Sequence, residues 1–345
     1  MNNVEVIKAK QIAIEWHPGL SIFSSEKFLK AVGDEYGWLG GFDKSGKLKC
    51  ILPYTVIKKT IFRMVRFRVE TMPVERELSI NEEKAFLNSS VKYFRSIGVD
   101  MIIPATTNTI FRTYPDGADA APYGSYIIDL QQSEDDLWHN IDRRKRQQIN
   151  KAIKAGVTIR DGSDNLKEAY DLIVDTFKRS RLPFMSQEDF KAYIGGLGEN
   201  GKVIIADYNG VAQSYVVFGF SDYCVYAIYA GNVDNQQPGA NQLIYWEAIR
   251  RFKNLGVRQY DFVGARINPE KGSKQETINR MKRHFGAQLK QGYIWKYPIK
   301  PLKYKFYLIA SRWRSGGDIV DSERHKMYQV INPEEPTATS INKKL

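Results

Sequence analysis

The feature that most constrains the fold of this chain is a phrase that occurs twice. The end of a helix, a glycine and an apolar strand follow one another in FRSIGVDMIIP, residues 94–104, and again in FKNLGVRQYDFVG, residues 252–264. Gly98 and Gly256 stand directly after the helix, where glycine is favoured because it takes the left-handed conformation at little cost. We therefore expect a helix followed by a strand at the same point of two similar halves.

Each phrase is preceded by two strand-like runs that we interpret as a hairpin. In the first half the runs flank a polar turn at residues 43–47, and in the second they flank Asn209-Gly210, a strong two-residue hairpin signal. The same elements therefore recur in the same order. This recurrence predicts an α/β (α+β) protein with two tandem domains, each a mixed sheet flanked by helices.

The domain boundaries are expected where these patterns begin and end. We predict a first domain over residues 1–130 and a second over residues 131–298. A C-terminal helix over residues 299–331 should pack back on the first domain. The polar residues 332–345 are expected to be a disordered tail.

One helix is predicted over residues 133–156, between the two halves. Ser133 is a suitable N-cap, acidic residues follow it in the first turn, and Gly156 would end the helix. Its buried side should consist of Leu137, Ile141, Ile149 and Ile153. The other side is basic, and Arg144, Arg146 and Lys151 on it form either an RNA-facing stripe or a solvated face.

Composition narrows the class of function. The formal net charge of +12 suits a polyanionic partner, such as RNA, a nucleotide-linked substrate or an acidic membrane surface, without choosing among them. The two cysteines are isolated, and neither they nor the four histidines have the spacing of metal ligands, so we expect no metal site. The sequence lacks a signal-peptide core and any apolar run of about 18 residues, which predicts a cytoplasmic protein.

Several familiar phosphate-binding and nucleophile motifs are missing. There is no G-x-G-x-x-G, no P-loop and no G-x-S-x-G. What remains is a turn-rich loop at residues 231–241 that leads into a helix. Because a helix N-terminus offers free N–H groups and the positive end of the helix dipole, Gly239, Ala240 and Asn241 are candidates to bind the phosphates of a donor.

The predicted C-terminal helix is amphipathic. Leu302, Phe306 and Ile309 recur at helical spacing, with Lys303 and Lys305 among them. We weigh two interpretations. The apolar side packs on the first domain, or the helix rests on an anionic membrane surface as a basic amphipathic helix.

Three ordered motifs of the second half carry a resemblance to a known family. They are LWHNIDRRKRQQINKAIKAGVTI (137–159), PGANQLIYWEAIRRFKNLGVRQYDFVGA (238–265) and INRMKRHFGA (278–287). Over about residues 125–298 the chain resembles the acyltransferase domain of the FemABX peptidoglycan-bridge aminoacyltransferases and their GNAT-like acetyltransferase relatives. Met281 stands where the family's closing motif usually has Phe. Residues 165–200 leave no room for the long helical arm of some members.

The resemblance implies an acyltransferase in which an amine attacks an activated acyl group. Such a reaction needs two substrates held close together and a stabilised oxyanion. Lys282 aligns with the family's motif lysine and is the candidate for the oxyanion, although it could also be a solvated helix cation. The candidates for substrate binding, each with a surface or core role as its alternative, are Arg181, Tyr229, Asp261 and Arg280.

The expected reaction moves an aminoacyl or acyl group onto an amine of a cell-envelope precursor. The precursor would be a nucleotide- or lipid-linked sugar or peptide, and no bound cofactor is expected. Positive charge favours aminoacyl-tRNA slightly as the donor, since RNA binding scales with the Lys and Arg that neutralise phosphates. Acyl-CoA is the alternative donor. A third hypothesis is a non-catalytic protein that binds RNA or an anionic membrane.

Overall fold

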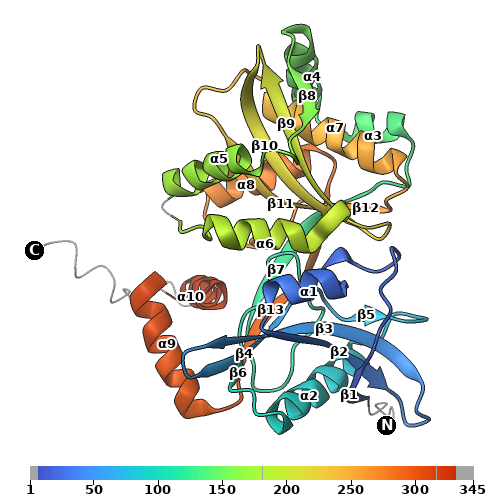
Figure 1. Ribbon diagram of the computed structural model, residues 1–345, viewed down its shortest axis with the longest axis vertical. Helices are drawn as coiled ribbons and strands as arrows, with labels where there is room; N and C mark the ends of the chain where they lie inside the picture. Colours follow the sequence, from blue (N-terminus) through green and yellow to red (C-terminus); the bar gives the residue numbers. More distant parts are fainter. Residues whose placement is uncertain (1–6, 181, 316, 332–345) are drawn as a thin grey trace, which may run out of the picture.

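The computed structural model describes residues 7–180, 182–315 and 317–331. Over these residues the strands form one long mixed sheet, and helices cover its two faces (Figure 1). The strands are β1 (Lys8–Ile12), β2 (Glu35–Phe42), β3 (Leu48–Lys59), β4 (Phe62–Phe67), β5 (Met72–Pro73), β6 (Met101–Ile102), β7 (Asp119–Asp129), β8 (Thr158–Asp161), β9 (Gly201–Tyr208), β10 (Val211–Phe220), β11 (Val225–Asn232), β12 (Gln259–Asp261) and β13 (Gln288–Pro298). The helices are α1 (Glu26–Val32), α2 (Ile80–Ser96), α3 (Glu134–Asn140), α4 (Arg143–Lys154), α5 (Leu166–Arg179), α6 (Gln187–Leu197), α7 (Ala240–Asn254), α8 (Lys274–His284), α9 (Pro301–Ser315) and α10 (Ile319–Ile331).

The sheet confirms the internal repeat. In the first half, β1 to β4 are antiparallel neighbours and β4 lies parallel to β6, while α2 connects the two. In the second half, β8 to β11 are antiparallel neighbours and β11 lies parallel to β12, while α7 connects them. Two mixed sheets of the same design are therefore joined edge to edge, and the predicted fold class is confirmed.

The two halves exchange their last strands at the join. Strand β7, which ends the first half, pairs with β12 of the second. Strand β13, which ends the second half, pairs with β6 of the first. Between them β7 and β13 are antiparallel, from Gln288 opposite Ile127 to Lys296 opposite Asp119. Each half therefore completes its sheet with a strand from the other.

The predicted turns are present. Asn209 and Gly210 have φ angles of 52° and 77°, as the tight hairpin between β9 and β10 requires. Gly98 and Gly256 have φ angles of 78° and 81° just after α2 and α7. These left-handed positions explain why the chain uses glycine at both helix ends.

The prediction of a single helix over residues 133–156 is wrong, because the helix is interrupted at Ile141-Asp142 and two helices, α3 and α4, form instead. The Asp142 carboxylate accepts a hydrogen bond from Arg144 N at 2.9 Å and so caps α4, while its own N–H donates to His284 O at 2.8 Å. The predicted Leu137, Ile141 and Ile149 are buried, but Ile153 is 51% exposed. Ala152 is buried in its place.

Each half has its own apolar core. Helix α2 covers one face of the first-half sheet with Phe86, Leu87 and Phe94. In the second half α4 and α7 cover one face of the sheet, and α5 and α6 cover the other. The broad apolar side of α7 includes Leu243 and Phe252, both buried.

The halves also meet through a close crossing of α1 and α6. A side chain on Gly196 of α6 would place its Cβ 2.6 Å from Ala31 Cβ and 3.3 Å from Phe28 Cα. Only glycine therefore permits this approach. Phe28 and Leu197 continue the contact in a cluster that joins both halves, together with Phe23 and Tyr226.

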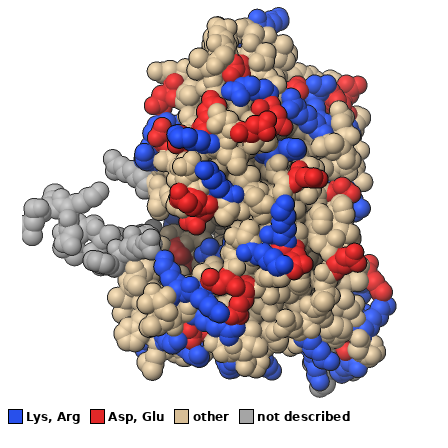
Figure 2. Space-filling view, viewed as in Figure 1, with Lys and Arg blue, Asp and Glu red and all other residues tan. Residues whose placement is uncertain are grey.

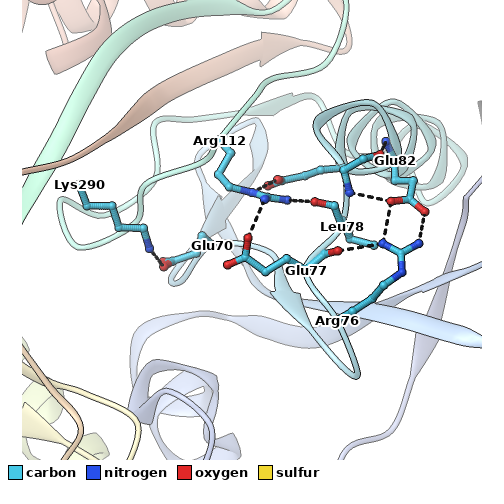
Figure 3. A network of polar contacts seen from close by, with 9 residues as sticks. Glu70, Arg76, Glu77, Leu78, Glu82, Arg112 and Lys290 are labelled. Carbon is cyan, nitrogen blue, oxygen red and sulfur yellow. Dashed lines mark hydrogen bonds and ion pairs between the residues drawn. The ribbon is translucent and has the colours of Figure 1, made fainter. Parts of the chain in front are cut away.

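A network of ion pairs holds the segment between β4 and α2 (Figure 3). Arg112 pairs with Glu83 at 2.8 Å and with Glu77 at 3.3 Å, and it also donates to Leu78 O. Glu82 pairs with Arg76 and completes a capping box with Ser79 at the start of α2. Glu70 pairs with Lys290 of β13 at 2.9 Å, which ties this segment to the exchanged strand.

The segment after β13 forms two helices. Tyr304 on α9 packs with Met64, Met101 and Ile103 of the first half. Val320 on α10 packs with residues of β7 and β13. The buried Lys296 of β13 pairs with Asp318 at 2.9 Å and with Asp321 at 2.6 Å, both at the start of α10. The tail expected over residues 332–345 lies outside the described residues.

Candidate active site

A cavity of about 980 Å³ lies between the two halves. It corresponds to the hollow on the left of Figure 2, between the upper and lower parts of the molecule. The first half contributes α1, β4 and the loop after β6, the second contributes α6, β11 and the end of β12, and α9 and α10 close one side. The lining residues used below are Arg66, Arg68, Tyr193, Tyr229, Val263 and Tyr307.

Two arginines from the first half enter this cavity, and neither forms an ion pair among the residues that the structure describes. Arg68 is 6% exposed, and its guanidinium donates to Thr55 Oγ1 at 3.0 Å and to Val32 O at 2.6 Å. Arg66 stands two residues earlier, and its Nε is buried without a hydrogen-bond partner in the described chain. Burial lowers the pKa of Arg66, and burial with the charge of Arg66 lowers the pKa of Arg68 to about 9. Two partly desolvated cations close together form a candidate anion site.

The carboxylates that line the cavity do not neutralise these arginines. Asp318 already pairs with Lys296. Asp34 is exposed and accepts from the backbone N of Lys58 at 2.6 Å, and Asp189 is exposed at the start of α6. The positive charge of the cavity is therefore not balanced by an ion pair within the described residues.

Aromatic side chains form the wall from the second half. The ring centroids of Tyr193 and Tyr229 lie 5.8 Å apart with an angle of 62° between the ring planes, and Phe184 lies edge-on to Tyr229 at 5.1 Å. Burial raises the pKa of Tyr229 to about 12, so its hydroxyl stays protonated and can donate. Tyr229, predicted as a substrate-binding residue, thus lines the cavity beside the two arginines.

A kinked backbone forms the cavity floor after β12. Val263 and Gly264 both have positive φ angles, 51° and 72°, and a left-handed conformation is costly for a β-branched residue. Lys282 of α8 supports the kink from behind, since its Nζ donates to Val263 O at 2.8 Å and to Gly264 O. Lys282 is 5% exposed, and burial lowers its pKa to about 8.

Lys282 therefore lies neither in solvent nor in the cavity wall. It is separated from the cavity by the Val263-Gly264 backbone, and two of its three N–H groups are already used. The alternative of a solvated helix cation is wrong, because the side chain is buried. The predicted oxyanion role stays a prediction.

Asp261 is the last residue of β12, two positions before Val263, and its side chain is buried. Its carboxylate accepts from Ser125 Oγ of β7 and from Val263 N at 2.7 Å. Burial raises the pKa of Asp261 to about 6, and these two hydrogen bonds oppose the rise. Asp261 faces a small pocket with Glu70 and Lys290 and does not line the main cavity.

The residues predicted to bind donor phosphates lie at the start of α7, away from the cavity lining. Gly239 and Ala240 are buried because α4 packs on them. A Cβ on Gly239 would lie 2.1 Å from Gln148 O. Asn241 is half-buried, with its Oδ1 accepting from Ser214 Oγ at 3.2 Å.

The remaining predicted residues are spread over the surface. Arg280 is exposed on α8, and Arg181 lies outside the described residues. Arg144 and Lys151 are exposed on α4, and Arg146 is half-buried on the same helix. Within the described ranges, no group of three or more His, Cys, Asp or Glu is placed to hold a metal ion.

The sequence analysis missed Arg66 and Arg68. The run IFRMVRFRVE (61–70) contains the signal, because alternation places residues 66 and 68 on the same face of a strand as the apolar Phe62 and Met64. Two like charges on such a face are unusual unless they bind an oppositely charged group. Tyr193 had no comparable signal, since α6 brings it to the cavity only through the crossing with α1.

Comparisons with known proteins agree with this architecture. The model of the FemAB family matches residues 113–214. The crystal structure of FemX has a TM-score of 0.63 and 13% identity, covering 86% of this chain and 99% of the other. The C-terminal domain of a putative lysylphosphatidylglycerol synthetase from Agrobacterium fabrum has a TM-score of 0.50 and 12% identity, covering 86% and 94%. No curated protein matches the sequence.

The FemX match shows the fold, and the FemAB match covers the segment from the end of the first half to β10. Together they confirm the family likeness that the sequence motifs indicated. The predicted class of protein, an acyltransferase, is in line with this likeness.

Proposed function

We propose that this protein transfers an aminoacyl or acyl group onto an amine of a cell-envelope precursor that also carries an anionic group. The observation that carries the proposal is a pair of arginines in the cavity between the halves, Arg68 buried and Arg66 half-buried, that form no ion pair among the described residues. A phosphate or pyrophosphate on the precursor would supply the missing counter-charge, and guanidinium groups bind such oxyanions well.

The cavity suits the acceptor better than a whole donor. A volume of about 980 Å³ is at the upper end of small-molecule sites, large enough for a sugar or short peptide linked to phosphate. Tyr193, Tyr229 and Tyr307 supply aromatic surface and hydroxyl groups for such an acceptor. Arg66 and Arg68 at one wall would then fix the anionic end of the acceptor, so that its amine lies toward the floor.

In the proposed reaction the amine nitrogen bonds to the acyl carbonyl carbon and the bond to the donor oxygen or sulfur breaks. One proton passes from the amine to the leaving group. The Val263-Gly264 kink lies at the floor, and we propose that Lys282 holds this backbone and places positive charge behind it. That charge would stabilise the oxyanion that forms on the carbonyl.

We favour aminoacyl-tRNA as the donor, in the cytoplasm. Exposed cations on α4, including Arg144 and Lys151, offer contacts to RNA phosphates. Acyl-CoA remains the second candidate, but its expected phosphate site at Gly239 and Ala240 is covered by α4. The lysylphosphatidylglycerol synthetase likeness supports a lipid-linked acceptor among the precursors to be tested.

The anion site can be tested without knowing the substrate. Pyrophosphate should raise the Tm of the protein by about 3–5 °C at a hundred times its Kd, because it binds only the folded state. The double variant R66M/R68M should lose this rise. Its own Tm reflects two opposing effects, since two uncompensated charges are removed while Thr55 Oγ1 and Val32 O lose their donor. R95M/R258M makes the same change in net charge at exposed positions and should keep the full response.

Transfer itself is tested with radiolabelled aminoacyl-tRNAs and acyl-CoAs against nucleotide-linked and lipid-linked envelope precursors. R68M should raise the KM for the acceptor at least tenfold with a smaller change in kcat. If neither donor yields product, yet RNA or anionic vesicles bind with steep salt dependence, the protein is a non-catalytic binder and the proposal fails. Stabilisation by CoA with no effect of charged tRNA would reverse the choice of donor.

A further inference from the structure

One face of α9 exposes large apolar side chains. Leu302, Phe306 and Ile309 are 73%, 63% and 67% exposed, and their spacing of four and three residues places them in one row. Ala310 and Lys305 are exposed on the same side. Three large apolar residues in a row are more than the scattered exposure that is normal for a protein surface.

This exposure does not come from a loosely attached helix. The opposite face of α9 is anchored, since Tyr304 is buried with Met64 and Met101. Lys303 donates to Ile61 O at 2.8 Å and pairs with Asp100 at 3.0 Å. Tyr307 reaches the cavity between the halves. The helix is therefore fixed in place and presents its apolar row outward.

The turn between β3 and β4 extends the same surface. Ile61 is 61% exposed at this turn, next to the anchoring bond from Lys303. Lys59 on the turn and Lys305 on α9 are exposed, and neither has an ion pair among the residues that the structure describes. The surface thus combines four apolar side chains with two free cations. We call Lys59, Ile61, Leu302, Lys305, Phe306 and Ile309 the α9 surface.

We propose that the α9 surface docks on an anionic lipid membrane. Apolar side chains beside unpaired lysines match the boundary of a bilayer, where acyl chains lie beneath negatively charged head groups. A second copy of the chain fits less well, because a symmetric contact would bring Lys59 and Lys305 near their own copies. The net charge of +12 adds attraction toward an anionic surface at longer range.

Membrane docking bears on the proposed function, because it affects which acceptor can reach the cavity; this consequence rests on the proposed function. A helix is about 10 Å across. With the outer face of α9 on the membrane, Tyr307 on its inner side places the cavity within about one helix diameter of the head groups. An acceptor with a phosphate-linked lipid could then enter the cavity while its lipid remains in the bilayer. A lipid-linked class of acceptor is therefore preferred over a nucleotide-linked one.

Vesicle co-sedimentation with the full chain tests the docking and needs no activity. The protein should bind vesicles of phosphatidylglycerol and phosphatidylcholine in equal parts, and bind pure phosphatidylcholine at least tenfold more weakly. F306D/I309D should reduce binding at least tenfold. K59E/K305E should reduce it about twentyfold or more, since each lysine near such a surface contributes about fivefold. The controls V211D/L255D and K44E/K271E alter matched exposed residues elsewhere and should bind like the wild type.

Each other outcome contradicts the proposal. Equal binding by F306D/I309D and the wild type, with both Tm values unchanged, would remove the α9 surface from membrane contact. A dimer in light scattering that F306D/I309D dissociates, without vesicle binding, would assign the surface to a second copy. Binding that appears only when residues 332–345 are deleted would assign it to the chain's own C-terminus. A failed transfer assay leaves the vesicle result intact, so the two proposals can fail separately.

Discussion

At the scale of single residues, the ammonium group of Lys282 ties α8 to the kink that follows β12. Its two hydrogen bonds satisfy the carbonyls of Val263 and Gly264, which would otherwise lie unpaired beneath the cavity floor. K282M should therefore lower the free energy of unfolding by about 2 kcal/mol, because buried carbonyl groups lose a charged donor. Urea denaturation measures the change. R280M, on the exposed side of the same helix, should stay within about 0.5 kcal/mol of the wild type.

The kinetic part of the same prediction separates a structural from an electrostatic role. If the charge of Lys282 stabilises the oxyanion, K282M should lower kcat by about a hundredfold or more at saturating substrates. Because the pKa of Lys282 is lowered to about 8, the wild-type rate should also fall as the pH rises above 8. If the wild-type rate keeps rising to pH 9.5 and the kcat of K282M stays within threefold of the wild-type value, then Lys282 only supports the kink and does not stabilise the oxyanion.

The carboxyl group of Asp261 makes a prediction about stability and pH. Burial raises its pKa from near 3.8 to about 6, so the folded state binds this proton more tightly than the unfolded state. This group's contribution to stability is therefore present below pH 4 and is lost as the pH rises toward and through 6. Between pH 4 and 7, the free energy of unfolding of the wild type should therefore fall by up to about 3 kcal/mol relative to that of D261N.

D261N is a suitable comparison, because its amide oxygen can still accept from Ser125 and from Val263 N. Urea denaturation at pH 4, 5.5 and 7 gives the free energies of unfolding of the wild type and D261N. Taking their difference at each pH removes the contribution of the other carboxylates, which titrate in both proteins. D175N, at an exposed position on α5, should run parallel to the wild type. A difference between D261N and the wild type that does not change with pH would show that Asp261 has an ordinary pKa.

At the scale of elements, the crossing of α1 and α6 depends on one of two adjacent glycines. A Cβ on Gly195 would meet nothing within 4 Å, whereas one on Gly196 would meet Ala31 Cβ at 2.6 Å. G195A should stabilise the protein by about 0.5–1 kcal/mol, because alanine favours the helix. G196A should destabilise it by about 1–2 kcal/mol through overpacking. Thermal denaturation of both variants checks the contrast.

A compensating change identifies the cause. A31G removes the methyl group that G196A would strike, so A31G/G196A should recover most of the lost Tm. No recovery would place the strain of G196A elsewhere on α6 and would contradict the proposed helix contact.

Local elements with strong signals could be predicted from the sequence. The Asn209-Gly210 hairpin and the glycines after α2 and α7 depend on backbone conformations that few residues adopt, and the structure has all of them. The break between α3 and α4 was missed because it depends on His284, which receives the Asp142 N–H from a distant part of the chain. Caps can be recognised locally, but a tertiary partner that ends a helix cannot.

The candidate site was harder to predict for a related reason. Tyr229 was found because a strand end beside a loop is a common place for a ligand. The direction of the Lys282 side chain could not be predicted, since exposed Arg280 and buried Lys282 are two residues apart on one basic helix. The coverage of Gly239 by α4 likewise depends on the packing of two helices distant in sequence.

At the scale of the whole molecule, the charged side chains are scattered over one face, whereas the strands exchanged between the two halves lie together at one place in the sheet. On the face shown in Figure 2, basic and acidic side chains alternate, so the net charge is not gathered in one patch there. Specific anion binding must then come from local arrangements such as Arg66 with Arg68, where burial strengthens a charge–charge interaction. The exchange of β7 and β13, in contrast, joins the halves at the middle of the sheet (Figure 1).

This exchange predicts that neither half folds alone. A fragment of residues 1–130 would keep β7 but lose both of its partners, β12 and β13, and β6 would lose β13. The long ladder of β7 with β13 and its short ladder with β12 would leave unpaired backbone groups facing solvent. Trp295, which is buried in the first-half core, would be missing. The fragment should therefore show no cooperative thermal transition by circular dichroism, whereas the full chain should unfold in a single transition.

Co-expression distinguishes exchange from simple instability. Residues 1–130 and 131–345, produced together as separate chains, contain every strand and should assemble into a soluble complex, because the pairings of β7 and β13 do not require the loop at residues 130–131. Size-exclusion chromatography and the melting curve of the complex measure the result. A folded, monomeric fragment 1–130 with its own cooperative melting curve would contradict the argument, since it would mean that the first half completes its sheet without the strand supplied by the second.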